Sequence, residues 1–288
     1  MYNYFLIKLG QFIVLSFPLK IAYSIAVLIS DINYLFAKED KQAVKENLKV
    51  IFPQKSDQEI NQIRIKLFRN FAKYLTDFFR FSKMDLSYIN KYVRVENRSY
   101  LDQALAKGKG VIVVSAHLGN WELGGVVVAL LGYPFSAVAL PHKNKQINNF
   151  FNRQRQSKNF KVIPLGKAAR QCLDVLKKNE VLALAGDRDF TEKGIVLDFF
   201  GKPSFFPIGP AAFALKTGAV LMPGFMYRND DDGLTLRFEK PLEFSPSGDK
   251  NQDLKYLIEN YKNIIQDYIR KYPEQWYMFK RFWIEEKK

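Results

Sequence analysis

The sequence feature that most constrains the fold is a run of four β-branched apolar residues, Val111-Ile112-Val113-Val114, near the middle of the chain. An apolar run of this length, with no polar alternation, is typical of a strand buried on both faces of a sheet. Parallel strands of that kind need crossover connections, usually helices, which cover the two faces. We therefore expect an α/β fold built around this strand.

The sequence on either side of the run alternates between strand and helix patterns. Strands are predicted at residues 135–140, 161–163, 181–185 and 234–238, and a helix end followed by a strand is predicted within residues 215–226. Helices are predicted at residues 121–131, 144–158, 168–179 and 254–269. Alternation with short loops predicts a layered, mixed but largely parallel sheet flanked by helices.

The first 90 residues have a different, helical pattern. A polar helix is predicted near residues 38–52, and Ser56 with Glu59 has the form of a capping box that starts another helix. Apolar residues spaced by three and four give that helix one apolar face, which we expect to pack on a core. We predict an N-terminal anchoring segment at residues 1–30, a helical part at 31–90 and an α/β domain at 91–288.

Residues 5–30 are strongly apolar and long enough to cross a bilayer core, which needs about 20 residues. Lys8, Pro18 and Lys20 interrupt the segment, and no acidic residue occurs in it before Asp31. A small-residue cleavage site is absent from the pattern, so we do not interpret the segment as a removed signal peptide. Three interpretations stay open: a spanning helix, a helix lying in the membrane interface, and a buried helix of a soluble protein.

The charge balance predicts a polyanionic partner. Lysine and arginine total 44 against 29 acidic residues, which gives a net charge of +15. Such an excess is typical of proteins that bind nucleic acid, anionic membranes or phosphorylated substrates, and the 15% aromatic content favours the membrane. The single cysteine, Cys172, excludes an internal disulfide framework and a cysteine-built zinc site.

The candidate chemistry centres on one of the two histidines, His117, which follows the buried strand. In open α/β sheets ligands bind beyond the carboxyl ends of the strands, where His117 would lie. Glu122 comes five residues later, at the start of the predicted helix, and across a tight turn it could hold the imidazole. His117 would then accept a proton near neutral pH. A capped helix with an incidental histidine is the alternative explanation of this pattern.

Residues 117–122, His-Leu-Gly-Asn-Trp-Glu, resemble the H-x4-[DE] signature of the lysophospholipid acyltransferase superfamily, and specifically its lipid A biosynthesis (late) acyltransferase branch. Five further stretches resemble that family in the same order. They are Asn47-Leu48 with Phe52-Pro53, Arg155 with Val162-Ile163-Pro164, Gly186-Asp187 with Asp189, Phe199-Phe200-Gly201 with Gly209-Pro210, and Pro273-Glu274-Gln275-Trp276. Arg188 stands where the family usually has glutamine, and Phe279-Lys280-Arg281-Phe282 replaces the usual paired arginines, which leaves the acceptor preference open.

The resemblance implies a glycerol-3-phosphate acyltransferase-like fold on the cytoplasmic face of the cell inner membrane. It implies transfer of a fatty acyl group from an acyl carrier protein or coenzyme A thioester to a hydroxyl of a lipid A-type phosphoglycolipid precursor. No metal or cofactor and no nucleic acid is expected. The alternatives are acylation of another polar lipid, such as a phosphatidylinositol mannoside or an aminolipid, and a non-catalytic basic protein that binds membrane or nucleic acid.

The catalytic residues expected from this chemistry are His117 and Glu122. An alcohol that attacks a thioester must lose a proton, which His117 can take, and the oxyanion that forms needs hydrogen-bond donors. The backbone N–H groups of Gly119 and Asn120, or the side chain of Arg155, are the candidate donors.

Three further residues are expected to bind substrate or to orient groups that do. Arg155 lies in a basic segment, and its planar guanidinium suits a phosphate on the acceptor. Asp187, at a predicted strand end, is expected to orient Arg155 or its neighbour Arg188.

Overall fold

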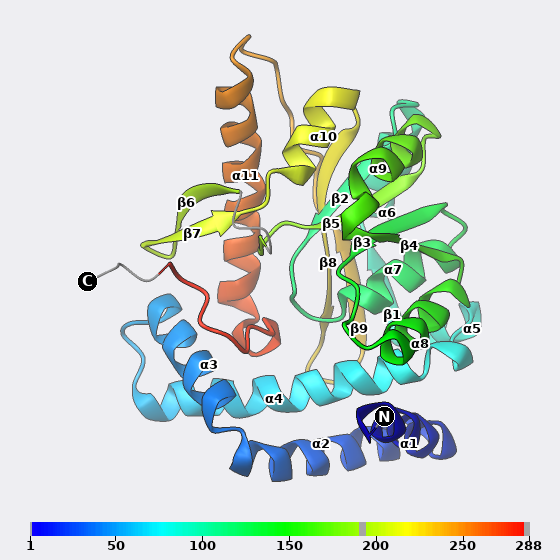
Figure 1. The fold of residues 1–288 in the computed structure, drawn as a ribbon, viewed down its shortest axis with the longest axis vertical. Helices are drawn as coiled ribbons and strands as arrows, with labels where there is room; N and C mark the ends of the chain where they lie inside the picture. The colour runs from blue at the N-terminus through cyan, green and yellow to red at the C-terminus, as the bar shows by residue number, and fades with distance from the viewer. Residues whose placement is uncertain (1, 190–193, 285–288) are drawn as a thin grey trace.

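The computed structural model describes residues 2–189 and 194–284, and in this part of the chain a seven-stranded sheet forms the centre (Figure 1). The strand order is β1-β9-β8-β2-β5-β3-β4. The bounds are β1 Val93–Glu96, β2 Val111–Ser115, β3 Phe135–Ala139, β4 Phe160–Pro164, β5 Val181–Ala185, β8 Val220–Arg228 and β9 Leu234–Phe238. Adjacent strands run parallel except for the antiparallel pair of β8 and β9. This confirms the predicted mixed, largely parallel sheet.

Helices cover both faces of the sheet. The bounds are α5 Leu86–Tyr92, α6 Arg98–Ala106, α7 Trp121–Leu130, α8 Lys145–Gln156, α9 Ala168–Lys177, α10 Gly209–Thr217 and α11 Lys250–Lys271. Val111 and Val113 of β2 pack in one core cluster with α6 and α7, whereas Ile112 and Val114 pack in another with α9, α10 and α11. Strand β2 is uniformly apolar because both of its faces are buried.

The sequence patterns did not predict some of the elements. They are β1, α6, most of α10, and a two-stranded hairpin of β6 (Ile195–Phe199) and β7 (Lys202–Phe206). Strand β1 is four residues long and only partly buried, so it lacks an apolar run. In the hairpin, Phe200 and Gly201 both have positive φ angles, as a tight two-residue turn requires, although phenylalanine rarely takes that conformation.

The N-terminal residues form a helical layer under one edge of the sheet (Figure 1). Its helices are α1 Tyr2–Ser16, α2 Leu19–Phe36, α3 Lys38–Ile51 and α4 Asp57–Phe79, followed by a short turn of 3-10 helix, Phe81–Lys83. Pro18 separates α1 from α2, so the apolar segment is two helices rather than one. Both pack on α4, along its side away from the sheet.

Helix α4 begins at the predicted capping box. The Ser56 hydroxyl accepts a hydrogen bond from the Glu59 N–H, and the Glu59 carboxylate accepts one from the Ser56 N–H at 2.9 Å. One side of α4 packs against α1 and α2, and the other packs against α7 and the C-terminal segment. The helix is therefore the connection between the N-terminal layer and the α/β body.

Replacing Gly125 in α7 with alanine should destabilise the fold. A Cβ atom at Gly125 would lie 2.7 Å from ring atoms of both Phe135 and Phe160, so these rings would have to move. We expect a loss of about 1–3 kcal/mol in the free energy of unfolding, as for other overpacked cores, measured by urea denaturation.

Gly209→Ala is the control, because an added Cβ at this helical glycine would meet no heavy atom within 4 Å beyond its chain neighbours and its own helix backbone. We expect a clearly smaller loss of stability than for Gly125→Ala, because no core ring has to move and the only cost is the helical conformation of an alanine before Pro210. Equal unfolding midpoints for Gly125→Ala and the unsubstituted protein would contradict the prediction.

Candidate active site

His117 lies in the turn that joins β2 to α7 (residues 116–120, here the β2–α7 turn), at the carboxyl edge of the sheet. Gly119 in this turn has φ +63°, and a Cβ atom there would lie 2.0 Å from the Met226 carbonyl oxygen. Only glycine fits such a position. Asn120 then caps α7, its side-chain oxygen accepting a hydrogen bond from the Leu123 N–H at 3.1 Å.

Backbone hydrogen bonds join the β2–α7 turn to its neighbours. Gly119 N–H donates to the Gln275 carbonyl at 2.8 Å, and Asn120 N–H donates to the Met226 carbonyl at 2.7 Å. Tyr277 N–H donates to the His117 carbonyl at 3.0 Å. The two N–H groups expected to receive an oxyanion thus have partners within the chain, and would have to leave them in order to bind substrate.

The carboxylate on the His117 ring belongs to Asp187, not to Glu122 as the short spacing suggested. Asp187 Oδ1 lies 2.9 Å from His117 Nδ1, and its Oδ2 accepts hydrogen bonds from the His117 N–H at 3.0 Å and from Trp276 Nε1 at 3.1 Å. The Asp187 side chain is 0% exposed and the His117 side chain 20%. The imidazole is therefore oriented by a buried acid and is itself partly exposed.

Asp187 stays ionised in this position. Burial by itself raises its pKa, but the charge of His117 and the hydrogen bonds from His117 and Trp276 outweigh this effect, so the pKa lies below the usual value. An ionised carboxylate at Nδ1 holds the ring N–H there, which is the tautomer with its basic lone pair on Nε2.

Glu122 and Arg155 form a buried ion pair with each other. Arg155 Nε and Nη2 donate to the two Glu122 oxygens at 2.8 and 2.5 Å, and Nη1 donates to Asn152 at 3.2 Å. Burial alone lowers the pKa of Arg155, but Glu122 raises it above the usual value, so the guanidinium remains charged. This pairing fixes the start of α7 to α8, beside His117.

Aromatic side chains lie next to the imidazole. The Trp121 ring packs edge-on to His117 with ring centroids 5.2 Å apart, and Tyr74 of α4 stacks on Trp121 at 4.7 Å. Tyr277 of the C-terminal segment contacts both Tyr74 and Trp121. One side of His117 is thus an apolar wall built from three separate parts of the chain.

Arg188 lines an apolar cavity of about 270 Å³ at the carboxyl ends of β3 and β5. Its apolar lining includes Val138, Leu140, Leu165, Leu184, Pro207 and Phe213. Burial lowers the pKa of Arg188, an effect that Asp187 partly offsets. Arg188 and Asp189, which follow the carboxylate that orients His117, are the charged residues of the described lining, and the rest of the cavity suits an apolar chain.

Sequence reasoning missed three residues that hold this region together. Trp276 donates to Asp187, while Asp77 of α4 and Arg228 of β8 form a buried ion pair that also contacts Asn120. Trp276 belongs to the stretch Pro273–Trp276, which resembles the family's C-terminal motif, but the resemblance assigns no role to its side chain. Neither Asp77 nor Arg228 stands in any recognisable motif, and only the fold brings them together.

The whole chain matches a protein family of known function. Residues 1–285 match the family model for bacterial lipid A biosynthesis acyltransferases. A phosphatidylinositol mannoside acyltransferase of Mycolicibacterium smegmatis is 31% identical over 248 residues, 84% of this chain and 79% of that protein. A lipid A biosynthesis palmitoleoyltransferase of Escherichia coli is 29% identical over 251 residues, 86% of this chain and 80% of that protein.

Removing the charge of Glu122 should destabilise the protein strongly. Glu122→Gln leaves the buried Arg155 guanidinium uncompensated, which typically costs about 3–5 kcal/mol in the free energy of unfolding. The double variant Glu122→Gln/Arg155→Met removes both charges and should recover much of that loss in a denaturant titration.

Glu46→Gln is the control, because Glu46 pairs with Arg281 at the exposed surface. Exposed pairs contribute only about 0–1 kcal/mol, so this variant should change stability little. A Glu122→Gln protein as stable as the Glu46→Gln protein would show that the buried pair does not hold α7 to α8.

Proposed function

Since this chain belongs to the bacterial lipid A biosynthesis acyltransferase family and is an acyltransferase with a lipid acceptor, we propose that it moves a fatty acyl group from an acyl-carrier thioester to a hydroxyl of a phosphate-bearing glycolipid. The observation that carries the proposal is the His117–Asp187 pair at the carboxyl edge of the sheet. A buried acid that orients a partly exposed imidazole is the arrangement of a general base.

In the proposed reaction His117 Nε2 takes the proton of the acceptor hydroxyl as its oxygen attacks the thioester carbonyl. Asp187 holds the ring through Nδ1 at 2.9 Å and stabilises the imidazolium that forms. The tetrahedral intermediate then expels the thiolate, which takes the proton from His117, leaving an ester and a free thiol. The acyl group passes directly to the acceptor, so no enzyme-bound acyl intermediate is needed.

We assign the acyl chain to the mainly apolar cavity that Arg188 helps to line. Apart from Arg188 and Asp189 its lining carries no charged side chain among the described residues, and Arg188 is the residue after Asp187. Arg188 would lie near the thioester rather than the far end of the chain. Glu122 and Arg155 act in this proposal by fixing the start of α7. Because Arg155 is paired with Glu122, it could meet an acceptor phosphate only by sharing that pairing.

For the acceptor we propose a lipid A-type precursor, with a phosphatidylinositol mannoside as the second candidate. The family model over residues 1–285 favours the lipid A-type precursor, and the 31% identity to the mycolicibacterial relative favours the phosphatidylinositol mannoside. Both acceptors combine sugar hydroxyls with phosphate, which suits a protein of net charge +15. The same charge would attract an acidic acyl carrier protein, while coenzyme A is the alternative donor.

The N-terminal layer supports attachment to a membrane. Eleven large apolar side chains of α1, α2 and the link between them are exposed in the described structure: Phe5, Leu6, Leu9, Phe12, Phe17, Ile21, Leu28, Ile29, Ile32, Leu35 and Phe36. Scattered apolar residues are normal at protein surfaces, but a concentration on two adjacent helices marks an interaction surface. By length and composition α2 could also cross a membrane.

We propose that α1 and α2 lie in the interface of the cytoplasmic leaflet of the inner membrane, rather than spanning it. Ala22, Tyr23 and Ser30 of α2 are buried, so one face of the helix is committed to the protein. A helix with one face on protein and one exposed apolar face suits an interfacial position. The net charge of +15 suits the anionic lipids of the cytoplasmic leaflet, which favours that side of the membrane.

Replacing His117 with alanine should reduce acyl transfer by at least about 10²-fold, because the general base is lost. Asp187→Asn should also lower kcat substantially, since it removes the charge that stabilises the imidazolium. The measurement uses acyl carrier protein and coenzyme A thioesters with each candidate acceptor, and mass spectrometry of the lipid product.

The control is His142→Ala, which removes the other histidine, an exposed one whose ring contacts that of Phe151 at a tilt. We expect this variant to retain transfer. A His117→Ala protein that is folded and keeps activity within about threefold of the unsubstituted enzyme would overturn the mechanism. Transfer to one acceptor class alone identifies the substrate.

Charges on the exposed faces of α1 and α2 should weaken membrane binding. Phe36 is 76% exposed, and Phe36→Asp combined with Phe12→Asp places two carboxylates on the apolar surface. We expect these changes to release much of the protein from anionic phospholipid vesicles in a flotation assay. Tyr256→Asp, on α11 and 50% exposed, is the control and should float as the unsubstituted protein does. If the Phe12/Phe36 variant floated as fully as the unsubstituted protein, the membrane contact would not lie on α1 and α2.

A further inference from the structure

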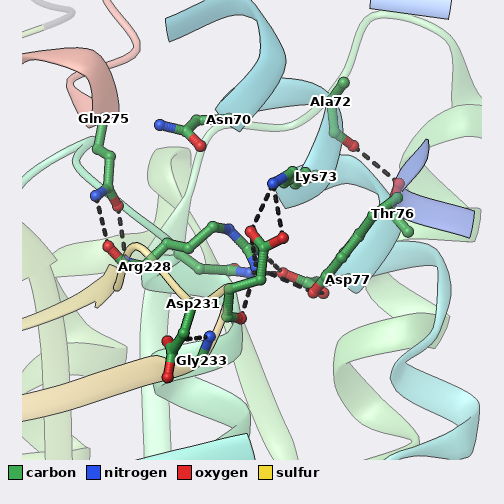
Figure 2. Close-up of polar contacts among 12 residues, drawn as sticks. Asn70, Ala72, Lys73, Thr76, Asp77, Arg228, Asp231, Gly233 and Gln275 are labelled. Carbon is green, nitrogen blue, oxygen red and sulfur yellow. Dashed lines mark hydrogen bonds and ion pairs between the residues drawn. The ribbon is translucent and has the colours of Figure 1, made fainter. Parts of the chain in front are cut away.

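Asp77 joins three elements that meet behind the β2–α7 turn. It lies on α4, is 0% exposed, and accepts hydrogen bonds from Tyr23 of α2, Asn120 at the start of α7, and Arg228 at the end of β8. Figure 2 shows the Asp77 carboxylate beside the Arg228 guanidinium, with Lys73 of the same helix nearby. A buried carboxylate needs such partners, because an unpaired charge in the interior is very costly.

Asn120 connects Asp77 to the β2–α7 turn. Its side-chain Nδ2 donates to Asp77 Oδ2 at 2.8 Å, and its Oδ1 accepts from the Leu123 N–H at 3.1 Å. Both ends of the amide are therefore engaged, one with α4 and one with the first turn of α7. A shift of the Asp77 carboxylate would move the residue three positions after His117.

Arg228 fixes the other side of the same turn. Its backbone N–H and carbonyl make paired hydrogen bonds of 2.8 Å with the Gln275 side chain, as Figure 2 shows. The Gln275 carbonyl in turn accepts from the Gly119 N–H at 2.8 Å. The Asp77–Arg228 pair is thus connected to the turn through both Asn120 and Gly119.

We propose that Tyr23 is a positioning residue for the acyl transfer reaction, acting through Asp77 and Asn120 on the turn that carries His117. The proposal rests on the proposed role of His117 as the base. It assigns helix α2, the helix with the exposed apolar face, a contribution to kcat in addition to its place in the N-terminal layer.

The Tyr23 hydroxyl is suited to this role because it contacts both members of the buried pair. It donates to Asp77 Oδ1 and accepts from Arg228 Nη1 at 3.1 Å, and its ring lies 4.8 Å from the guanidinium carbon. Burial, together with the charge of Asp77, raises the pKa of Tyr23, so the hydroxyl keeps the proton it donates. Without that donor, Asp77 Oδ1 loses its hydrogen bond, and the carboxylate can rotate away from Asn120.

The experiment compares Tyr23→Phe with Tyr34→Phe. Tyr34 also lies on α2, and its hydroxyl bonds to Asn61 at 2.9 Å and to Arg64 at 2.8 Å, both on α4. Each variant therefore removes one hydroxyl from the same α2–α4 interface, but only Tyr23 connects to the β2–α7 turn. Thermal unfolding of both variants measures the purely structural effect.

We expect Tyr23→Phe to lower kcat about tenfold with the KM for the acyl donor unchanged, since small displacements of catalytic groups have effects of this order or larger. Tyr34→Phe should leave kcat unchanged at a comparable loss of stability. A Tyr23→Phe enzyme with the kcat of Tyr34→Phe would overturn the proposal.

A second readout separates this proposal from the proposed function. The chain has only two histidines, so NMR signals of ¹⁵N-labelled histidine rings can be assigned with His142→Ala. Tyr23→Phe should shift the His117 signals and Tyr34→Phe should not, whether or not the chosen lipid acceptor is a substrate. Unshifted His117 signals in Tyr23→Phe would show that Tyr23 does not position the ring.

The exchange Asp77→Asn/Asn120→Asp tests the connection itself. In this double variant the amide at position 77 donates to the carboxylate at position 120, the reverse of the original direction. Aspartate at position 120 can still cap α7. We expect kcat above that of either single variant. A double variant no more active than Asp77→Asn would show that the contact between positions 77 and 120 does not matter for turnover.

Discussion

The parallel pairing of β2 with β5 is the constraint on which the site depends. In this register Ser115 lies opposite Ala185, so the residues two positions beyond, His117 and Asp187, leave the sheet side by side. The 2.9 Å contact between their side chains follows from that alignment. A shift of one residue between these strands would separate the imidazole from its carboxylate and turn the buried side chains toward the wrong faces.

Two buried ion pairs flank the β2–α7 turn. Glu122 with Arg155 ties α7 to α8, and Asp77 with Arg228 ties α4 to β8. Taking charges out of water is costly, and buried pairs contribute little net stability. Their geometry is specific, however, because arginine and carboxylate meet in fixed directions. We infer that these pairs set the position of the turn more than they stabilise the fold.

The N-terminal layer connects this region to the proposed membrane surface. Helix α4 contacts α1 and α2 on one side and the β2–α7 turn on the other, through Tyr74 and Asp77. The outer faces of α1 and α2 remain apolar and exposed. In the proposed arrangement, a lipid acceptor held in a bilayer would approach a protein in which one helix, α4, separates α1 and α2 from the β2–α7 turn.

The sequence by itself determined the elements whose signals are local. The apolar run of β2 marked a strand buried on both faces, the Ser56–Glu59 pattern marked the start of α4, and the position of His117 after β2 placed it at the carboxyl edge of the sheet. Short elements with partly buried sides, such as β1 and the β6–β7 hairpin, gave no such signal. Each of the successful predictions depended on residues within a few positions of one another.

Only the tertiary structure decided which charged groups meet. The nearest carboxylate in sequence, Glu122, pairs with Arg155, which is 33 residues away, while His117 takes Asp187, 70 residues away. Asp77 and Arg228 are separated by 151 residues. Strand register and helix packing set these contacts, and both arise from the burial of apolar side chains across the whole sheet rather than from any local pattern.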